Sequence, residues 1–226
     1  MSMDYLGLTN KFLIETGVSD QVATLVDAYD DVAQAANWID TAWNEIQISR
    51  RWAFRFAEKT FSVTNGTTSY TNNALGLADG DMVIPNSFYN ANGAIEHITY
   101  KELRDKRRAA STTQDTSRVY HIATEVGKLE TYPDVDTTQS ITFDYLKGIQ
   151  TLVTNADVPY GLPSDYHMMI VHSAIAKYGV LIGGNEGANL YNMHGPRYRK
   201  YFNDFVQLNN KDSEEDTTPA RGTLLA

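Results

Sequence analysis

The sequence predicts an α+β fold in which a helical bundle carries an inserted antiparallel β domain. Apolar residues recur at three- and four-residue steps in about residues 22–49 and 167–208, which is typical of helices. Between these segments apolar and polar residues alternate and turn-forming pairs separate the runs, which is typical of strands. The expected domains are the N-terminal helices of the bundle at 1–56, the inserted antiparallel β domain at 57–150, the C-terminal helices of the bundle at 151–208 and an extended C-terminal tail at 209–226.

The first fifty residues predict two helices. Residues 9–16 form a short helix that ends at Gly17, because glycine readily adopts the left-handed conformation of a C-terminal cap. Ser19 and Asp20 are typical N-terminal caps, so the second helix is expected over about residues 22–49. The apolar stripe of this second helix consists of Leu25, Tyr29, Val32, Ala36, Ile39, Trp43 and Ile46.

Near residue 50 the apolar period changes from helix-like to strand-like. Trp52, Phe54 and Phe56 occupy alternate positions, as they do in a strand. We therefore expect Trp52 and Phe54 to mark the junction at which the bundle passes into the β domain. Pro159 and Pro163 mark the return crossing, because proline stiffens such a connection.

Turn signals divide the middle of the chain into short strands. Asn65-Gly66 predicts a turn, and Asn92-Gly93 predicts a hairpin because both residues tolerate positive φ. A short charged helix is expected at 100–110. Three strand candidates follow, at 118–124, 128–133 and 140–148, and in the last of these Ile141, Phe143 and Tyr145 share one face.

The chain returns to helices after Leu162-Pro163. Ser164 or Asp165 is expected to cap the first of them, and Gly183-Gly184 is expected to end it. A second helix is expected from about Asn185, with an interruption at Pro196 because proline lacks an amide hydrogen. The polar segment after residue 208 has no apolar stripe, so it is expected to be a tail without a core of its own.

Composition and charge exclude several classes of protein. The 226-residue chain contains no cysteine, which rules out disulfides and Cys-ligated metals and favours an intracellular origin. Its formal net charge of −9 disfavours general nucleic-acid binding, which needs a basic face. No apolar run reaches the roughly 18 residues of a transmembrane helix. The first residues include Asp4 and lack a basic segment, which argues against a signal peptide.

Residues 157–181, DVPYGLPSDYHMMIVHSAIAKYGVL, hold many side chains capable of chemistry. His167 and His172 are five residues apart, a rotation of about 140° on a helix, so they cannot face one metal ion. Asp157 and Asp165 come from the same segment, whereas acid/base catalysis needs groups that converge on a pocket. The other histidines, His97, His121 and His194, are isolated in the sequence and are expected to be packed or surface residues. We therefore expect no catalytic, cofactor-binding or metal-binding residue.

The order of features along the chain resembles a known family, although no single motif is specific to it. A Trp-x-Phe entry in RRWAFRFAEKTFSV is followed by NGTTSYT, by Tyr132-Pro133-Asp134 and by an extended Phe/Tyr strand. Pro159 and Leu162-Pro163 then precede the return helix. This order resembles the adaptor, or head-to-tail connector, proteins of tailed bacteriophages, including those called tail tubular protein A. The chain departs from that pattern after Gly66, where a Y-x-L-P segment is missing.

The resemblance covers about residues 5–208 and implies a structural virion protein without catalysis or cofactor. About twelve copies would form a ring below the portal and continue the DNA channel toward the tail. The implied partners are the portal, the next tail or nozzle component, and DNA that passes through the lumen without specific contacts; no membrane is implied. The implied location is the neck or tail of the virion, after assembly in the host cytoplasm. Docking of the C-terminal segment on the portal would involve Asp216, Pro219, Arg221, Leu224 and Leu225.

Three other hypotheses stay open from the sequence. The chain could be another neck or tail-completion ring protein of the virion, with a different number of subunits. An enzyme, such as a small hydrolase, would need a pocket in which histidines and carboxylates converge. A soluble binding module of the host is the third.

Overall fold

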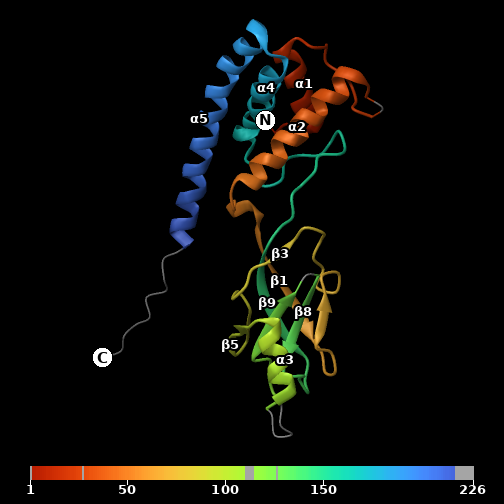
Figure 1. Ribbon diagram of the computed structural model, residues 1–226, viewed down its shortest axis with the longest axis vertical. Coiled ribbons are helices and arrows are strands. Elements are labelled where there is room, and N and C mark those ends of the chain that lie inside the picture. The colour runs from red at the N-terminus through yellow and green to blue at the C-terminus, as the bar shows by residue number, and fades with distance from the viewer. Residues whose placement is uncertain (1, 27, 110–114, 126, 217–226) are drawn as a thin grey trace, which may run out of the picture. The chain divides into compact units, whose positions relative to one another are not determined.

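The structure is a computed structural model that describes residues 2–26, 28–109, 115–125 and 127–216, with the side chains of 211–216 excluded (Figure 1). The chain divides into two compact units. We call Met1–Phe54 with Ile149–Ala226 the helical unit, and Arg55–Gly148 the β unit. Helices form the first unit and a mixture of strands and one α-helix forms the second, so the predicted α+β class with an inserted β domain is confirmed.

Helix α4 lies at the centre of the helical unit. It packs against α1 and α2 on one side and against α5 on the other (Figure 1). The bounds of these helices are Tyr5–Thr16 for α1, Asp30–Ser49 for α2, His167–Ile182 for α4 and Gly184–Asp216 for α5. Two short 3₁₀ helices, Ala53–Arg55 and Ser164–Tyr166, precede β1 and α4 respectively.

Local capping explains where α1 begins and ends. The carboxylate of Asp4 accepts a hydrogen bond from the amide of Gly7, at 2.8 Å, and satisfies one of the free amides of the first turn. Gly17 has a φ of 67°, and its amide donates to the carbonyl of Leu13, so the predicted helix end is confirmed.

The second helix starts later than the sequence predicts. Ser19 and Asp20 do not cap it; α2 begins at Asp30, where Tyr29 precedes it without a side-chain cap. Side chains from elsewhere hold the intervening segment in a non-helical form. Asn10 forms two hydrogen bonds with the backbone of Val22, and Asn155 accepts one from the amide of Leu25. These bonds satisfy backbone groups that a helix would otherwise pair.

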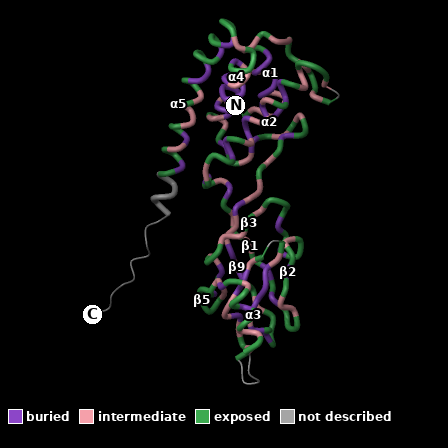
Figure 2. Tube along the Cα trace, in the orientation of Figure 1, coloured by how far each residue is buried: buried purple, intermediate pink, exposed green. Residues whose placement is uncertain are grey.

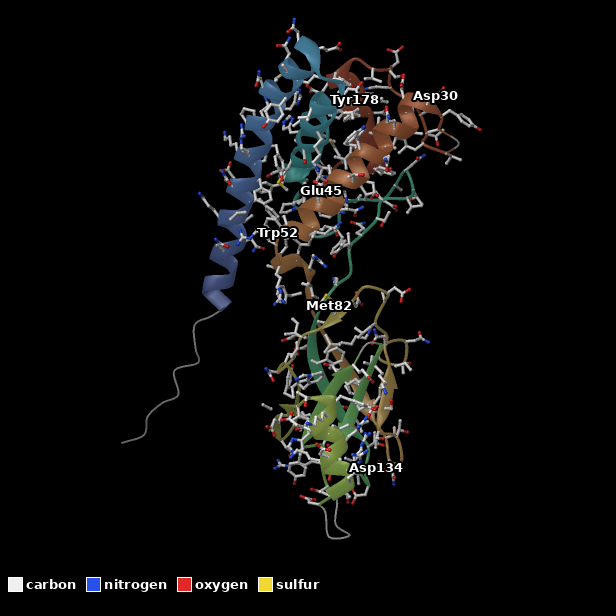
Figure 3. The ribbon with its side chains drawn as sticks, viewed as in Figure 1. Asp30, Glu45, Trp52, Met82, Asp134 and Tyr178 are labelled. Carbon is white, nitrogen blue, oxygen red and sulfur yellow. The ribbon has the colours of Figure 1, made fainter. Side chains whose placement is uncertain are left out.

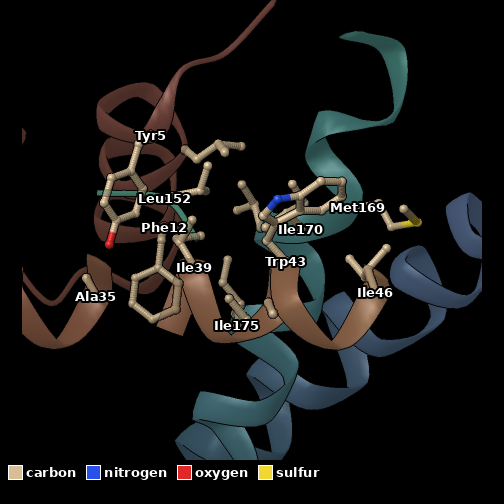
Figure 4. Close-up of a cluster of buried hydrophobic side chains, with 14 of the residues drawn as sticks. Tyr5, Phe12, Ala35, Ile39, Trp43, Ile46, Leu152, Met169, Ile170 and Ile175 are labelled. Carbon is tan, nitrogen blue, oxygen red and sulfur yellow. The ribbon is translucent and has the colours of Figure 1, made fainter. Parts of the chain in front are cut away.

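The core of the helical unit lies where α1, α2 and α4 meet (Figure 4). Burial of each large side chain there contributes roughly 1.5–3 kcal/mol. The predicted α2 stripe is confirmed for Ala36, Ile39, Trp43 and Ile46, which are buried. It is wrong for Tyr29, which precedes the helix and is 77% exposed. Figure 2 shows the buried residues on the inner sides of these helices.

The last helices also differ from the prediction in their ends. Neither Ser164 nor Asp165 caps α4; its first residue follows Tyr166, and no side-chain cap bond is made there. Helix α5 continues through Pro196 without interruption, because residues on both sides of the proline, such as His194 and Phe205, are buried in the helical unit. It also extends to Asp216, so residues 209–216 are helical and not an extended tail.

The β unit contains two sheets. In the first, the order is β1-β9-β4-β5, with β3 also paired to β9, and every pairing is antiparallel. In the second, the order is β2-β8-β7-β6, and only the β6–β7 pairing is parallel among the described strands. The strands are β1 Phe56–Val63, β2 Ser69–Thr71, β3 Met82–Val83, β4 Tyr89–Asn90, β5 Gly93–Ala94, β6 Glu96–His97, β7 His121–Glu125, β8 Lys128–Tyr132 and β9 Gln139–Leu146.

The predicted hairpin and charged helix are present in the β unit. Strands β4 and β5 pair as expected, but Asn90 pairs with Gly93, so the two loop residues are Ala91 and Asn92. Helix α3, Tyr100–Ala109, packs against β7 through a buried Leu103. Ile141 and Phe143 on β9 are buried in the core of the unit, and Tyr145 packs against the same cluster, as predicted.

Among the described residues, none of the helices has the length and apolar character needed to span a membrane.

Candidate functional site

His167 is a packed residue at the start of α4. Its Nδ1 accepts a hydrogen bond from the amide of Met3 at 3.0 Å, so its proton resides on Nε2, which lies 3.1 Å from the carbonyl oxygen of Leu162. The side chain is buried, and both ring nitrogens are engaged with backbone groups. It fixes the start of the chain to the start of α4.

His172 and His194 form a buried pair that the sequence did not predict. Their Nδ1 atoms lie 3.0 Å apart, so one ring donates to the other. The ring of Tyr201 lies beside His172, with centroids 5.7 Å apart. Burial lowers the pKa of both histidines, that of His172 to about 4, so both are neutral near neutral pH. The pair forms because α4 packs on α5. The spacing of residues within one helix cannot predict a contact between two helices.

The two aspartates of the same segment do not form an acid/base group. Asp157 accepts hydrogen bonds from the amides of Val153 and Thr154, and from the Thr154 hydroxyl, within one turn. These bonds, led by the one from the Thr154 side chain, lower the pKa of Asp157. Asp165 is exposed. Within the described part of the chain, no group of three or more His, Cys, Asp or Glu side chains is arranged to hold a metal ion.

Two hollows on the surface are large enough to be considered as reaction sites. One lies at the end of α1 and is lined by Leu13, Ile14, Gly17, Ser19, Asp20 and Gln21. The other lies on the β unit and is lined by Tyr89, Asn90, Ala91, Asn92, Thr138, Gln139, Ser140 and Thr142. Among the described residues, neither lining brings a histidine together with a carboxylate, the groups typical of acid/base catalysis.

Trp52 and Phe54 lie in the aromatic core of the helical unit. Trp52 is fully buried, donates from Nε1 to the carbonyl of Ile46 at 2.6 Å, and stacks on Phe205 with centroids 4.8 Å apart. Phe54 packs closely on Gly161, where an added Cβ would lie 2.5 Å from the Cβ of Phe54. Pro159 and Pro163 are the two prolines expected at the return crossing; Pro159 is buried and Pro163 is exposed.

Exposed apolar side chains lie in several parts of the helical unit. Among them, Val26 and Tyr29 lie between α1 and α2, and Tyr191, Met193 and Leu208 lie at separate points along α5. At the end of α4, three consecutive residues, Val180, Leu181 and Ile182, are exposed. Contiguous exposed apolar residues commonly mark contacts with other proteins. These surfaces are the strongest candidates for function.

The residues that the resemblance assigns to portal docking are beyond the part of the structure that can be described. Asp216 is the last residue of α5, and its side chain is not described. Pro219, Arg221, Leu224 and Leu225 lie outside the described residues.

The chain is therefore an α+β protein whose helical unit offers exposed apolar surfaces for contacts. The model of a family described as SU10 adaptor protein matches residues 3–223 of the chain. The chain belongs to the SU10 adaptor protein family, which makes it a phage structural adaptor protein and a component of the virion. The resemblance to tailed-phage adaptors is confirmed. A search of curated proteins finds no match.

Proposed function

We propose that about twelve copies of this chain form a ring that joins the portal to the tail and continues the DNA channel. The observation that carries the proposal is the family match, which spans residues 3–223 and so includes both units. The role is mechanical. The ring holds its neighbours through repeated contacts, and no chemical step is assigned to any residue.

The charge of the chain suits a channel through which DNA moves. A formal net charge of −9 makes the protein repel the DNA backbone, so a strand can pass without sticking. The partners in this proposal are the portal on one side and the next tail or nozzle component on the other. The contacts with portal involve Asp216 at the end of α5 and, in the segment that follows, Pro219, Arg221, Leu224 and Leu225.

Another neck or tail-completion ring protein is the second candidate. It shares the fold and the mechanical role but differs in the number of subunits and in its neighbours. Counting the subunits in averaged images separates the two candidates.

Electron microscopy of the purified chain mixed with portal tests the proposal. The expected result is a second ring stacked on the portal, with about twelve subunits in averaged top views. A chain that leaves the portal rings unchanged, and that itself gives no ring, contradicts the proposal.

A further inference from the structure

The helical unit has two outer faces on opposite sides of one central helix. Because α4 packs against α1 and α2 on one side and α5 on the other, the outer sides of these layers point away from each other (Figure 1). In Figure 3, Asp30 lies on the side of α4 away from α5. A subunit with two different faces on opposite sides can contact two neighbours at once.

The face built by α1, α2 and the segment between them is acidic. From residue 12 to residue 49 the chain contains no lysine or arginine. Asp20, Asp30 and Asp31 are exposed, and within the described part of the chain none of the three has an ion-pair partner. Val26 is 68% exposed and Tyr29 is 77% exposed beside them. This is the composition of an interface, with apolar anchors among charges.

The same acidic face is hollowed. The depression at the end of α1 has a volume of about 720 Å³ and is lined partly by Asp20. Such a hollow can receive side chains from a neighbouring molecule, and the carboxylate of Asp20 in its lining favours basic ones.

The outer face of α5 carries the opposite charge at its middle. Met193, Arg197 and Lys200 follow at steps of four and three residues, so they share one face of the helix. All three are exposed, and the two basic side chains have no ion-pair partner among the described residues. Arg199 is also exposed, but it lies two residues after Arg197 and therefore on another side of α5. Asp204 limits the basic stretch one turn after Lys200.

We propose that the α5 face of one copy, with Met193, Arg197 and Lys200, packs on the acidic face of the next copy. The acidic face contributes Tyr29, Asp30 and Asp31. Opposite charges on opposite sides favour a head-to-tail contact, and such contacts close into a ring when the rotation per subunit allows it. The inference rests on the proposed ring and names the surfaces that build it.

Charge reversal on each face tests the contact. Arg197→Glu/Lys200→Glu makes both faces of a subunit acidic, and Asp30→Lys/Asp31→Lys makes both basic. Each variant alone is expected to lose the ring in electron micrographs and in native mass spectra. An equal mixture is expected to regain it, because each reversed face then meets a face of opposite charge on the other variant.

A matched control makes the same change of charge elsewhere. Lys101→Glu/Arg104→Glu reverses two exposed charges on α3 of the β unit and is expected to leave the ring intact. Circular dichroism of all the variants checks that they remain folded.

Cross-linking gives a second test that changes no charge. The chain has no cysteine, so Tyr29→Cys and Met193→Cys can be introduced singly or together without background. Under mild oxidation the double variant is expected to form a ladder of covalent multimers on a denaturing gel. Each single variant is expected to stop at dimers at most, because one cysteine per chain cannot extend a ladder.

The outcomes separate this inference from the proposed function. The named contact is overturned, while the ring stands, if the wild type forms a ring, both charge-reversed variants still form it, and the double-cysteine variant gives no ladder. That result would also be expected if the acidic face lined the DNA channel. A wild-type chain that stays monomeric with portal overturns the ring and the contact together.

Discussion

The Nδ1 atoms of His172 on α4 and His194 on α5 lie 3.0 Å apart, and both side chains are buried. Glu15 and Lys11 of α1 and Arg197 of α5 are the charged groups that act on the pair. A proton added to either ring places a charge in a buried site, and a second proton leaves two donors facing each other.

Acid is therefore expected to destabilise the helical unit through this pair. Burial lowers the folded-state pKa of both histidines, so the unfolded chain binds protons first as the pH falls. The contribution of the pair is fully present above about pH 6.5 and is lost toward about pH 4, the folded-state pKa of His172. Chemical unfolding measured across this range should show less pH dependence for His172→Gln/His194→Gln than for the wild type. An unchanged slope in the double variant contradicts the prediction.

Trp52→Ala is expected to lower the free energy of unfolding by about 3–5 kcal/mol, because it leaves a cavity in the aromatic core. The side chain is fully buried against Phe205 and also donates a hydrogen bond to Ile46. Denaturant unfolding followed by circular dichroism measures the change. Val153→Ala removes methyl groups from a side chain that is 73% exposed and should cost less than about 0.5 kcal/mol. A loss below about 1 kcal/mol for Trp52→Ala would show that the side chain is not packed in this way.

Gly187→Ala tests the close contact of α5 with α4. An added Cβ at Gly187 would lie 2.2 Å from the carbonyl oxygen of Gly179, and backbone cannot move aside as a flexible side chain can. We expect a loss of about 1–3 kcal/mol in the free energy of unfolding. Gly195→Ala is a matched control on the same helix, because the atoms nearest to its Cβ would be Tyr191 ring atoms at 3.8–3.9 Å, an ordinary van der Waals contact. That change should be neutral or stabilise by up to about 1 kcal/mol. Equal losses in the two variants would argue against the helix contact.

Removal of residues 217–226 is expected to weaken binding to portal and leave the melting temperature unchanged. The shortened chain keeps the whole of α5, which reaches Asp216. A chain in which residues 217–226 are scrambled is the control for composition and length. Binding measured with purified portal should fall at least tenfold in both altered chains. Full binding by the shortened chain would remove the proposed docking role of this segment.

The sequence predicts the architecture well because its signals are local. The apolar period changes near Trp52 and again before His167, which separates helices from strands, and Gly17 and Gly183 end helices as expected. The predicted start of α2 was wrong because Asn10 and Asn155, from distant segments, form hydrogen bonds with the backbone at Val22 and Leu25. The helix was expected to begin there, after Ser19 and Asp20. No local signal could supply these contacts.

The candidate surfaces were harder to predict than the fold. His194 is isolated in the sequence and was not expected to have a histidine partner, although it pairs with His172 across two helices. It also placed Tyr29 in the core stripe, because helical spacing continues through a segment that is not helical. Which side chains remain exposed depends on where α2 begins and on which side of α4 each helix packs. Both are properties of the tertiary structure.

Native mass spectrometry of the chain mixed with purified portal shows whether the chain assembles on the portal as a ring. The expected species is a complex in which about twelve copies of the chain join one portal ring. A spectrum that contains only free monomer beside unaltered portal contradicts the proposed ring.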